Sequence, residues 1–428
     1  MSVAVQDRQT SLPAEEVAHA LLQFGRILLQ NGADTGRVQL ALRRFATALG
    51  YDARLLVSYE GIVLTVVSGE RFTTKIGSRI PAMNVGMSQA AAAFRILHSV
   101  EAGRLTLAEA TAALEKLEHA PPEYHRFLVA AGIGLTAASL SRLFGGDWAA
   151  FLACWVAAGL GTLARQDAGR RGFSPVVVSF LAALISGFLG GIGARVLGSE
   201  TAALCLVAPG MVIVPGVPLI NGVQDMIRNH ASLGVARIGF AFFVIAAIGL
   251  GLEIASHLSG VVLPLEMPSG SVPVPEDAVF AALAALGFVM LFNVPLKLAW
   301  ACAVCGVASH TMRLALMHYA GVDIVLGTLI GALLAGGLAQ ILAVRLDAPA
   351  ATFAFPGVVA MVPGIYGFRT FAGAMDIISG GPVPAPGVID ATMALAVTVL
   401  MITAAIAIGI AAPLAIAHPR AAEPAGGK

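Results

Sequence analysis

Hydrophobic positions follow two different patterns along this chain. Between residues 14 and 120 they recur at helical spacing or alternate with polar residues, as they do in a soluble domain. From Phe127 onward they form long apolar runs with short polar interruptions, and each run is close to the roughly 20 residues that a membrane-spanning helix needs. The pattern predicts a soluble head followed by a membrane-embedded part.

The head is predicted to be an α+β domain of residues 1–122. The predicted elements are helices over 14–32 and 36–50, strands within "ARLLVS", "GIVLTVVSG" and "RFTTKIG", and helices over 86–101 and 106–118. Asp34 or Thr35 can cap the second helix. Residues 59–61 and 69–70 are turn-like, and Pro121-Pro122 marks the domain boundary because paired prolines cannot continue a helix.

The membrane part is predicted to hold about ten helices in two groups of five. The apolar runs lie at 127–145, 148–165, 173–197, 201–224, 236–259, 278–296, 298–318, 322–344, 349–373 and 388–416. The longest connection contains Glu266, Glu276 and Asp277 and no basic residue. The predicted segments are a first half at 123–260, an outer linker at 261–277, a second half at 278–418 and a tail at 419–428.

Composition and charge support the membrane assignment. Hydrophobic residues make up 57% of the chain and charged residues 12%, with a mean hydropathy of +0.84. The net charge of +1 provides no field that would attract nucleic acid, so we expect no nucleic-acid partner. The polar first residues predict no cleavable signal peptide.

The positions of basic residues predict that both termini are cytoplasmic, in a bacterial-type inner membrane. Lys and Arg are enriched in short cytoplasmic loops. With the N-terminus inside, the cytoplasmic side receives Arg126, Arg165, Arg170, Arg171, Arg228, Arg237, Lys297, Arg345, Arg420 and Lys428. The far side receives only Arg142, Arg195, Arg313 and Arg369.

A Pro-Gly motif recurs in the fourth and ninth runs. The fourth reads "APGMVIVPGVPLINGVQDM" and the ninth reads "FPGVVAMVPGIYGFRTFAGAMD". Pro209-Gly210 in the fourth run corresponds to Pro356-Gly357 in the ninth, and Pro215-Gly216 corresponds to Pro363-Gly364. The distance between the two Pro-Gly pairs differs by one residue between the runs. An odd number of spans per repeat inserts the second copy upside down, so the chain is predicted to be two inverted five-helix repeats.

These motifs are predicted to break their helices. Proline removes a backbone donor and glycine weakens a helix. The freed backbone groups cannot face lipid, so they must be buried in protein or line a wet cavity, where half-helix ends can hold charged groups of a ligand. The alternative is that the prolines merely kink transmembrane helices.

Polar residues near the motifs complete the candidate site. The candidate substrate-binding or gating residues are Pro209, Gly210, Pro215, Gly216, Asn221, Pro356, Gly357, Pro363, Gly364 and Arg369. Asp225, Asp376 and Glu253 are candidates for proton coupling, because intramembrane acids are costly unless they are functional. Asp225, Arg369 and Asp376 could instead lie at helix ends in the headgroup layer. His310 is expected to be a packed, hydrogen-bonded histidine and not a ligand.

The sequence resembles the threonine/serine exporter family. The resemblance is carried by "LLQNGADTGRVQLALRRFATALG", by "GIVLTVVSG" and by the two Pro-Gly motifs, and it extends from about residue 20 to residue 415. It implies a cytoplasmic N-terminal domain fused to a ten-helix membrane domain. The implied activity is export of threonine and serine driven by the proton gradient.

Other classes of function are less well supported. A membrane-embedded enzyme would need a reactive motif such as H-E-x-x-H or G-x-S-x-G, which the sequence lacks, so we expect no enzyme activity. The alternatives are a channel or a transporter of another small polar metabolite, because broken helices also build pores. Cys302 and Cys305 are expected to pack between helices, and we predict neither a metal nor a cofactor. A homo-oligomer is compatible with the sequence.

Overall fold

The computed structural model describes residues 13–58, 61–68, 71–78, 85–262, 272–381 and 385–417. The turns predicted at residues 59–60 and 69–70, Glu266 and the tail with Arg420 and Lys428 lie outside this described part. The chain forms two compact units. Residues 1–84 and 89–120 make up the head unit, and residues 85–88 and 121–428 make up the membrane unit.

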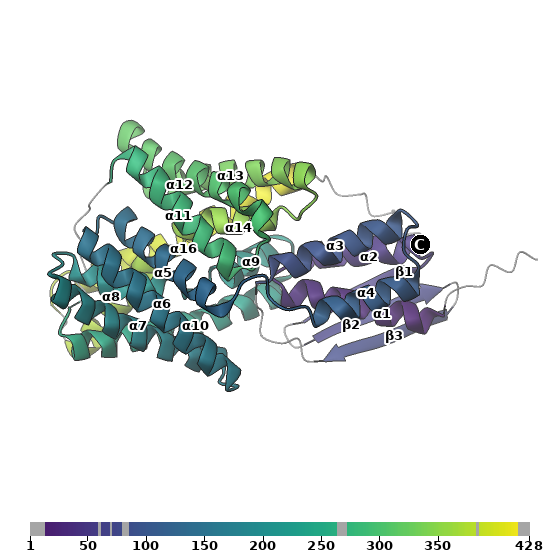
Figure 1. Ribbon diagram of the computed structural model, residues 1–428, viewed down its shortest axis with the longest axis horizontal. Helices are drawn as coiled ribbons and strands as arrows, with labels where there is room; N and C mark the ends of the chain where they lie inside the picture. Colours follow the sequence, from purple (N-terminus) through teal and green to yellow (C-terminus); the bar gives the residue numbers. More distant parts are fainter. Residues whose placement is uncertain are drawn as a thin grey trace, which may run out of the picture. The chain divides into compact units, whose positions relative to one another are not determined.

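The head unit has the helices and strands that the sequence predicts. Its elements are α1 (Ala14–Gln30), α2 (Thr35–Ala48), β1 (Asp52–Val57), β2 (Gly61–Ser68), β3 (Arg71–Ser78), α3 (Met87–Glu101) and α4 (Leu107–Glu118) (Figure 1). The strands form one antiparallel sheet of order β1-β2-β3. Ile62, Leu64 and Val66 alternate along β2 and are buried on the sheet face that α1 covers. This alternation fixes which face of the sheet enters the core.

Capping residues set the helix ends in the head. Asp34 accepts a hydrogen bond from the Arg37 backbone N–H at 3.0 Å, so Asp34 is the cap of α2 and Thr35 is its first residue. Gly32 has a φ of 88°, which closes α1 with a left-handed residue. Thr106 and Glu109 form a capping box at the start of α4. The "NGADTGR" segment is therefore a helix stop followed by a helix start.

The membrane unit is helical. Its elements are α5 (Arg126–Leu143), α6 (Trp148–Arg170), α7 (Pro175–Leu197), α8 (Ala202–Met211), α9 (Gly216–Ile227), α10 (Ala231–Ser259), α11 (Val274–Leu291), η1 (Leu296–Leu298), α12 (Ala299–Ala320), α13 (Ile324–Leu346), α14 (Ala351–Val358), η2 (Val359–Met361), α15 (Gly364–Ser379) and α16 (Val388–Ala417).

Within the described residues, 7 of these helices are long and apolar enough to cross a membrane, or up to 9 if each of two bent pairs is one span. The chain is thus a polytopic helical membrane protein. The remaining predicted run is α12, which carries the buried polar residues Ser309, His310 and Arg313. Glu276 and Asp277 were expected in the outer connection, but α11 begins at Val274 and includes both. Pro273 is the N-cap and Pro275 lies in the first turn, where the fixed φ of proline suits a helix start.

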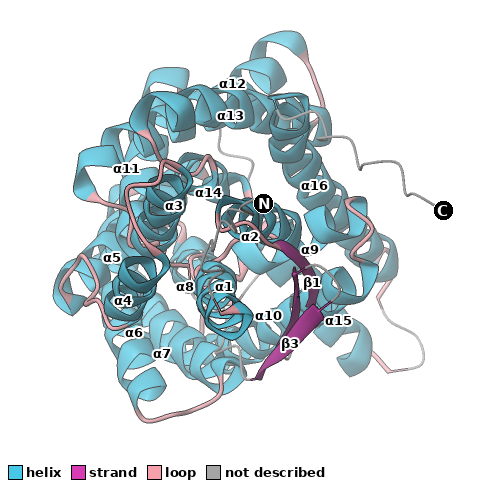
Figure 2. Ribbon diagram, turned by 90° about the vertical axis from the view of Figure 1, so that its right-hand side faces the viewer, coloured by secondary structure: helices cyan, strands magenta, loops and turns pink. Residues whose placement is uncertain are grey.

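The same helix pairings occur in both halves of the membrane unit. In the first half α5 packs on α6, α6 on α7, and α7 on α10, while α8 packs on α6 and α7. In the second half α11 packs on α12, α12 on α13, and α13 on α16, while α14 packs on α12 and α13. Figure 2 shows α8 and α14 inside a ring of the longer helices.

Matching sulfur contacts support this correspondence. The thiol of Cys154 on α6 lies 3.8 Å from the Leu204 carbonyl oxygen, and the thiol of Cys302 on α12 lies 3.3 Å from the Thr352 carbonyl oxygen. Each thiol thus contacts the short inner helix of its own half. All 4 cysteines are free and buried, as packing residues are.

The loop after α11 holds two segments of the membrane unit. Asn293 has a φ of 52°, and its side chain accepts a hydrogen bond from the Glu123 backbone N–H at 2.7 Å and donates one to Ser88 at 2.8 Å. The Tyr124 hydroxyl donates to the Val294 carbonyl at 2.7 Å. Ser88 and Glu123 both belong to the membrane unit, so this loop joins two of its segments that are distant in sequence.

The first helices of the two halves, α5 and α11, cross at glycines. A side chain on Gly287 would place its Cβ 1.9 Å from Thr136 Oγ1 and 2.3 Å from the Gly132 carbonyl oxygen. We predict that Gly287→Ala destabilises the protein by about 1 to 3 kcal/mol because the backbones must move apart. Gly337→Ala on α13 is the control, since its Cβ would meet no atom within 4 Å. The measurement is thermal unfolding of both variants in detergent. Equal melting temperatures would contradict this account.

Candidate functional site

Two helices of the membrane unit are broken where the sequence predicts. The axes of α8 and α9 differ by 56°, and those of the second pair, from α14 to α15, differ by 45°. Pro209 lies inside α8 and Pro356 inside α14. Each break is four residues long or shorter and separates the two helices of its pair. Bends of this size divide each span into two half-helices. The backbone groups at the new helix ends then lack partners within their own helix.

The chain turns in the same way at both breaks. The Gly216 N–H donates to the Val214 carbonyl at 2.8 Å, and the Gly364 N–H donates to the Val362 carbonyl at 2.7 Å. Between them, Pro215 has φ and ψ of −76° and 64°, and Pro363 has −77° and 49°. These values are those of an inverse γ-turn. Proline fixes the required φ, and the next helix then begins at glycine.

The two breaks touch each other. A Cβ on Gly216 would lie 3.2 Å from Val362 of the opposite break, and a Cβ on Gly364 would lie 3.2 Å from Met211. A Cβ on Gly210 would lie 3.5 Å from Phe368 on α15. Each glycine thus lets the other broken helix approach closely. The contacts are reciprocal, which places the starts of α9 and α15 near one another.

A serine satisfies a carbonyl that the second break frees. Ser309 on α12 donates its hydroxyl hydrogen to the Gly357 carbonyl at 2.7 Å. That carbonyl stands where α14 gives way to the short turn η2. Buried backbone groups without partners are costly in a membrane, so this bond stabilises the broken conformation. Ser309 could not be predicted from the sequence, because no local pattern links it to a residue 48 positions away.

A buried ion pair lies on the first broken helix. Asp225 and Asn221 on α9 are 0% and 2% exposed. Asp225 Oδ2 lies 2.8 Å from an Nη atom of Arg237 on α10, which is 1% exposed. Arg237 was expected on the cytoplasmic side, near the start of the run 236–259, and it lies further inside its helix because α10 begins at Ala231. The apolar residues before Arg237 were the signal that it lies inside a helix.

Close helix packing encloses this pair. A Cβ on Gly222 would lie 3.1 Å from the Gly234 carbonyl oxygen and 3.3 Å from the Arg237 side chain. Gln224 is also buried, at 2% exposed, and its Nε2 has no hydrogen-bond partner among the described residues. Gln224 was not among the residues predicted from the sequence. Its amide N–H is a donor that a bound ligand could satisfy.

The other predicted residues have different surroundings. Asp376 is exposed on α15, and Glu253 is half-buried with its carboxylate 3.4 Å from His257. The guanidinium of Arg369, which is half-buried, lies 6.0 Å from the ring centre of Tyr366. Of the three candidate proton carriers, Asp225 alone is buried by the protein. No group of three or more His, Cys, Asp or Glu side chains that could hold a metal occurs in the described part of the chain.

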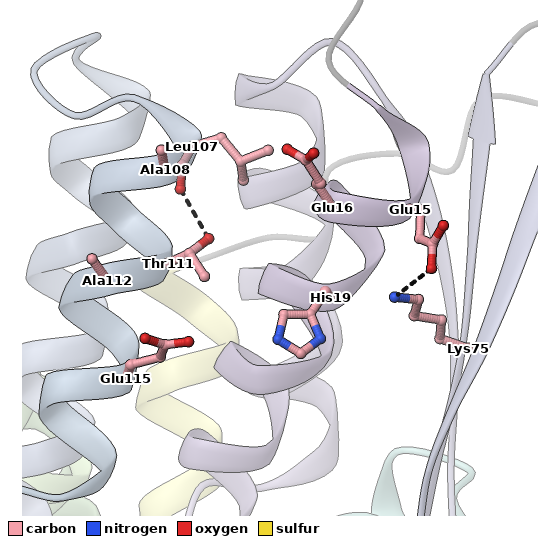
Figure 3. Close-up of a pocket in the computed structure, with 9 residues that line it drawn as sticks. All are labelled: Glu15, Glu16, His19, Lys75, Leu107, Ala108, Thr111, Ala112 and Glu115. Atoms are coloured by element: carbon pink, nitrogen blue, oxygen red, sulfur yellow. Dashed lines mark hydrogen bonds and ion pairs between the residues drawn. The ribbon is translucent and has the colours of Figure 1, made fainter.

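The head unit has a separate surface cavity of about 450 Å³ between α1 and α4. Figure 3 shows His19 and Glu16 on α1 facing α4, which contributes Thr111 and Glu115. Glu15, also on α1, lies 3.4 Å from the ammonium group of Lys75 on β3. None of these residues was predicted from the sequence. They are largely exposed, so water competes with any ligand here.

The Asp225–Arg237 pair predicts a specific pattern of stability. Asp225→Ala leaves a buried guanidinium without its carboxylate and is expected to cost about 3 to 5 kcal/mol. Adding Arg237→Met is expected to restore part of this loss, because no buried charge then remains unpaired. Asp376→Ala is the control and should change stability by less than about 0.5 kcal/mol, since Asp376 is exposed. Equal melting temperatures for the single Asp225 variant and the wild type would contradict the pairing.

Comparison with known proteins agrees with the sequence motifs. A family model described as "Putative threonine/serine exporter" matches residues 19–259, and a second, described as "Threonine/Serine exporter, ThrE", matches residues 277–416. No solved structure matches the chain.

Several curated proteins are similar. The chain is 28% identical to the "Probable succinate transporter subunit YjjP" of Escherichia coli over 251 residues, which is 57% of this chain and 95% of that protein. It is 25% identical to the "Probable threonine/serine exporter" of Mycobacterium tuberculosis over 86% of this chain and 72% of that protein. It is 24% identical to the "Threonine/serine exporter" of Corynebacterium glutamicum over 82% of this chain and 74% of that protein. Because the first family model covers more than half of the 428 residues, the chain belongs to the threonine/serine exporter family, in the form that carries both matched regions in one polypeptide.

Proposed function

We propose that this protein is a secondary active transporter that exports small amino acids, with threonine and serine as its substrates, in exchange for protons. The observation that carries the proposal is the reciprocal contact between two helices broken at Pro215-Gly216 and Pro363-Gly364. Pairs of discontinuous helices are how secondary transporters form a site within the membrane. The names of the family and of two of its similar proteins agree with this substrate class.

The proposed substrate site lies between the starts of α9 and α15. The first N–H groups of a helix have no partner within it and carry partial positive charge, so they suit a carboxylate. The carboxylate of a zwitterionic amino acid would face these groups. Its ammonium group would face the carbonyl ends of α8 and α14 or a carboxylate. Asn221 and Arg369 would gate or line this site, with Pro209, Gly210, Pro356 and Gly357 shaping the short helices.

The proposed architecture is a pair of inverted repeats. Residues 123–260 form one five-helix half and residues 278–418 the other, with α8–α9 and α14–α15 as single broken spans. The recurrence of the same helix pairings in both halves supports this arrangement, and five spans per half would invert the second copy. Residues 1–122 would then form a cytoplasmic domain, and both termini would be cytoplasmic in the inner membrane. Assembly as a homo-oligomer is part of the same proposal.

The proposed proton carriers are Asp225, Asp376 and Glu253. Asp225 is favoured because it is buried beside Arg237, so a change in its protonation would alter a strong local interaction. We expect Asp225→Asn to reduce gradient-driven threonine transport by at least about tenfold, a loss that corresponds to roughly 1.4 kcal/mol. Gradient-driven transport is also measured for Asp376→Asn and Glu253→Gln, and the loss in each variant shows how much that carboxylate contributes to proton coupling. Full gradient-driven transport in all three folded variants would show that these residues are not the carriers.

Succinate is a second candidate substrate. The observation that favours it is the 28% identity to proteins named as succinate transporter subunits. Succinate and threonine share a carboxylate, so the same helix N-termini could receive either one. The second carboxylate of succinate would replace the ammonium group, and this would require a cationic partner such as Arg369.

Reconstitution of the full-length protein into liposomes tests these alternatives together. Labelled threonine, serine and succinate are supplied with and without an imposed proton gradient. The proposal predicts saturable threonine flux that is stimulated by the gradient and competed by serine. Flux that does not saturate would indicate a channel. Gradient-driven succinate flux without threonine flux would overturn the amino-acid assignment.

A further inference from the structure

Asp277, His310 and Arg313 form a buried chain of hydrogen bonds that is not among the residues of the candidate site. His310 Nδ1 lies 2.8 Å from Asp277 Oδ1, and an Nη atom of Arg313 lies 2.7 Å from His310 Nε2. The three residues are 1%, 4% and 8% exposed. Asp277 comes from the first turn of α11, and the other two come from α12. A carboxylate and a guanidinium are thus bridged inside the protein by an imidazole.

The chemistry of arginine fixes the form of this imidazole. A guanidinium has only donors, so His310 Nε2 must accept the hydrogen bond and carries no hydrogen. Nδ1 then carries the hydrogen of the neutral ring and donates it to Asp277. The second oxygen of Asp277 accepts a hydrogen bond from the Thr311 hydroxyl at 2.9 Å. The carboxylate is therefore held on both oxygens, and His310 is locked in one tautomer.

Few charged groups surround this chain of hydrogen bonds. The titratable groups that face His310 within the described residues are Asp277 from α11 and Arg313 from α12. Tyr366 of α15 lies within electrostatic range of Arg313, and α13 approaches Arg313 through Gly327, which has no charge. Glu276, next to Asp277, is engaged with Arg142 of α5. Asp277 and Arg313 are therefore the charged groups that act most directly on His310.

The same helix is bonded to the second broken helix. Ser309, adjacent to His310, donates to the Gly357 carbonyl at 2.7 Å. Arg313 lies one turn further along α12, within electrostatic range of Tyr366, the third residue of α15. The start of α15 is the half-helix N-terminus at which a substrate carboxylate is proposed to bind. A change at His310 can therefore act on that terminus through Arg313.

We propose that His310 is a proton-binding residue that controls whether Arg313 is available at the start of α15. The proton would add to the lone pair of Nε2, and the Nδ1 hydrogen would stay on the ring. Protonated Nε2 cannot accept a hydrogen bond from Arg313, and the two cations repel each other. The guanidinium then leaves His310 and binds the carboxylate of the ligand at the first turn of α15. Loss of the proton restores the bond to His310 and releases the ligand. This inference rests on the proposed transport function, but its first test does not.

The first test measures the imidazole directly. Full-length protein with ¹⁵N-labelled histidine is placed in lipid nanodiscs, and the His310 signals are assigned by their absence in His310→Gln. We expect the neutral ring with hydrogen on Nδ1 at neutral pH, and conversion to the doubly protonated ring on acidification. Asp277→Asn removes the carboxylate that stabilises the cation and should shift this conversion to lower pH by about one unit or more. Hydrogen on Nε2 at neutral pH, no titration between about pH 4 and 8, or an unshifted titration in Asp277→Asn would overturn the proposal.

The second test measures the consequence for flux. Threonine exchange is followed in liposomes at equal internal and external pH over a range of pH values. His310→Gln keeps a donor and an acceptor but cannot take the proton, so its exchange rate should lose the acid-dependent change of at least about fivefold that the wild type has. His318→Gln, at an exposed position on the same helix, is the control and should keep the wild-type profile. An unchanged profile in His310→Gln overturns the proposed role of His310. If an imposed proton gradient does not change wild-type threonine flux in the reconstitution described above, while His310 titrates as expected, the transport mechanism is overturned and the proton-binding site stands.

Discussion

Inside a bilayer every backbone N–H and C=O needs a partner within the protein, and this requirement governs the two broken helices. A break near Pro215 or Pro363 frees several of these groups where lipid cannot satisfy them. The structure meets the requirement with an inverse γ-turn at each proline, with the Ser309 hydroxyl on the Gly357 carbonyl, and by enclosing α8 and α14 within longer helices. The residues at the starts of α9 and α15 are buried, which is why we propose that a polar ligand binds there.

Glycine makes the enclosure geometrically feasible. The crossing of α5 and α11 depends on Gly287 facing the Gly132 backbone, and the approach of α9 to α10 depends on Gly222 facing Gly234. The contact between the two breaks uses Gly216 and Gly364. Helices in membranes associate through such small residues because hydrophobic burial provides little driving force there. The close α9–α10 packing also removes water from Asp225 and Arg237, which strengthens their mutual attraction.

Local rules predicted the features that depend on adjacent residues. Apolar runs located the long helices, alternation located β2, and proline followed by glycine located both breaks. The sequence could not predict partners that meet only in the folded bundle. Asp225 meets Arg237 across two helices, Ser309 meets Gly357 across 48 positions, and His310 meets Asp277 across 33. Asp277 was assigned to the outer connection because its charge was considered without His310 and Thr311, the partners that make its burial tolerable.

The central claim is that a ligand binds where the two breaks meet, and substrate protection of a single cysteine tests it most directly. Val362, which contacts Gly216 across the breaks, is replaced by cysteine in full-length protein whose four native cysteines are changed to alanine. The rate of its alkylation by a maleimide is then measured with and without threonine. Val344→Cys on α13, which is 77% exposed and away from the breaks, is the control. The account predicts that threonine slows labelling at position 362 in a saturable way and leaves position 344 unchanged. Equal rates at position 362 with and without saturating threonine, in protein that transports threonine, would contradict it.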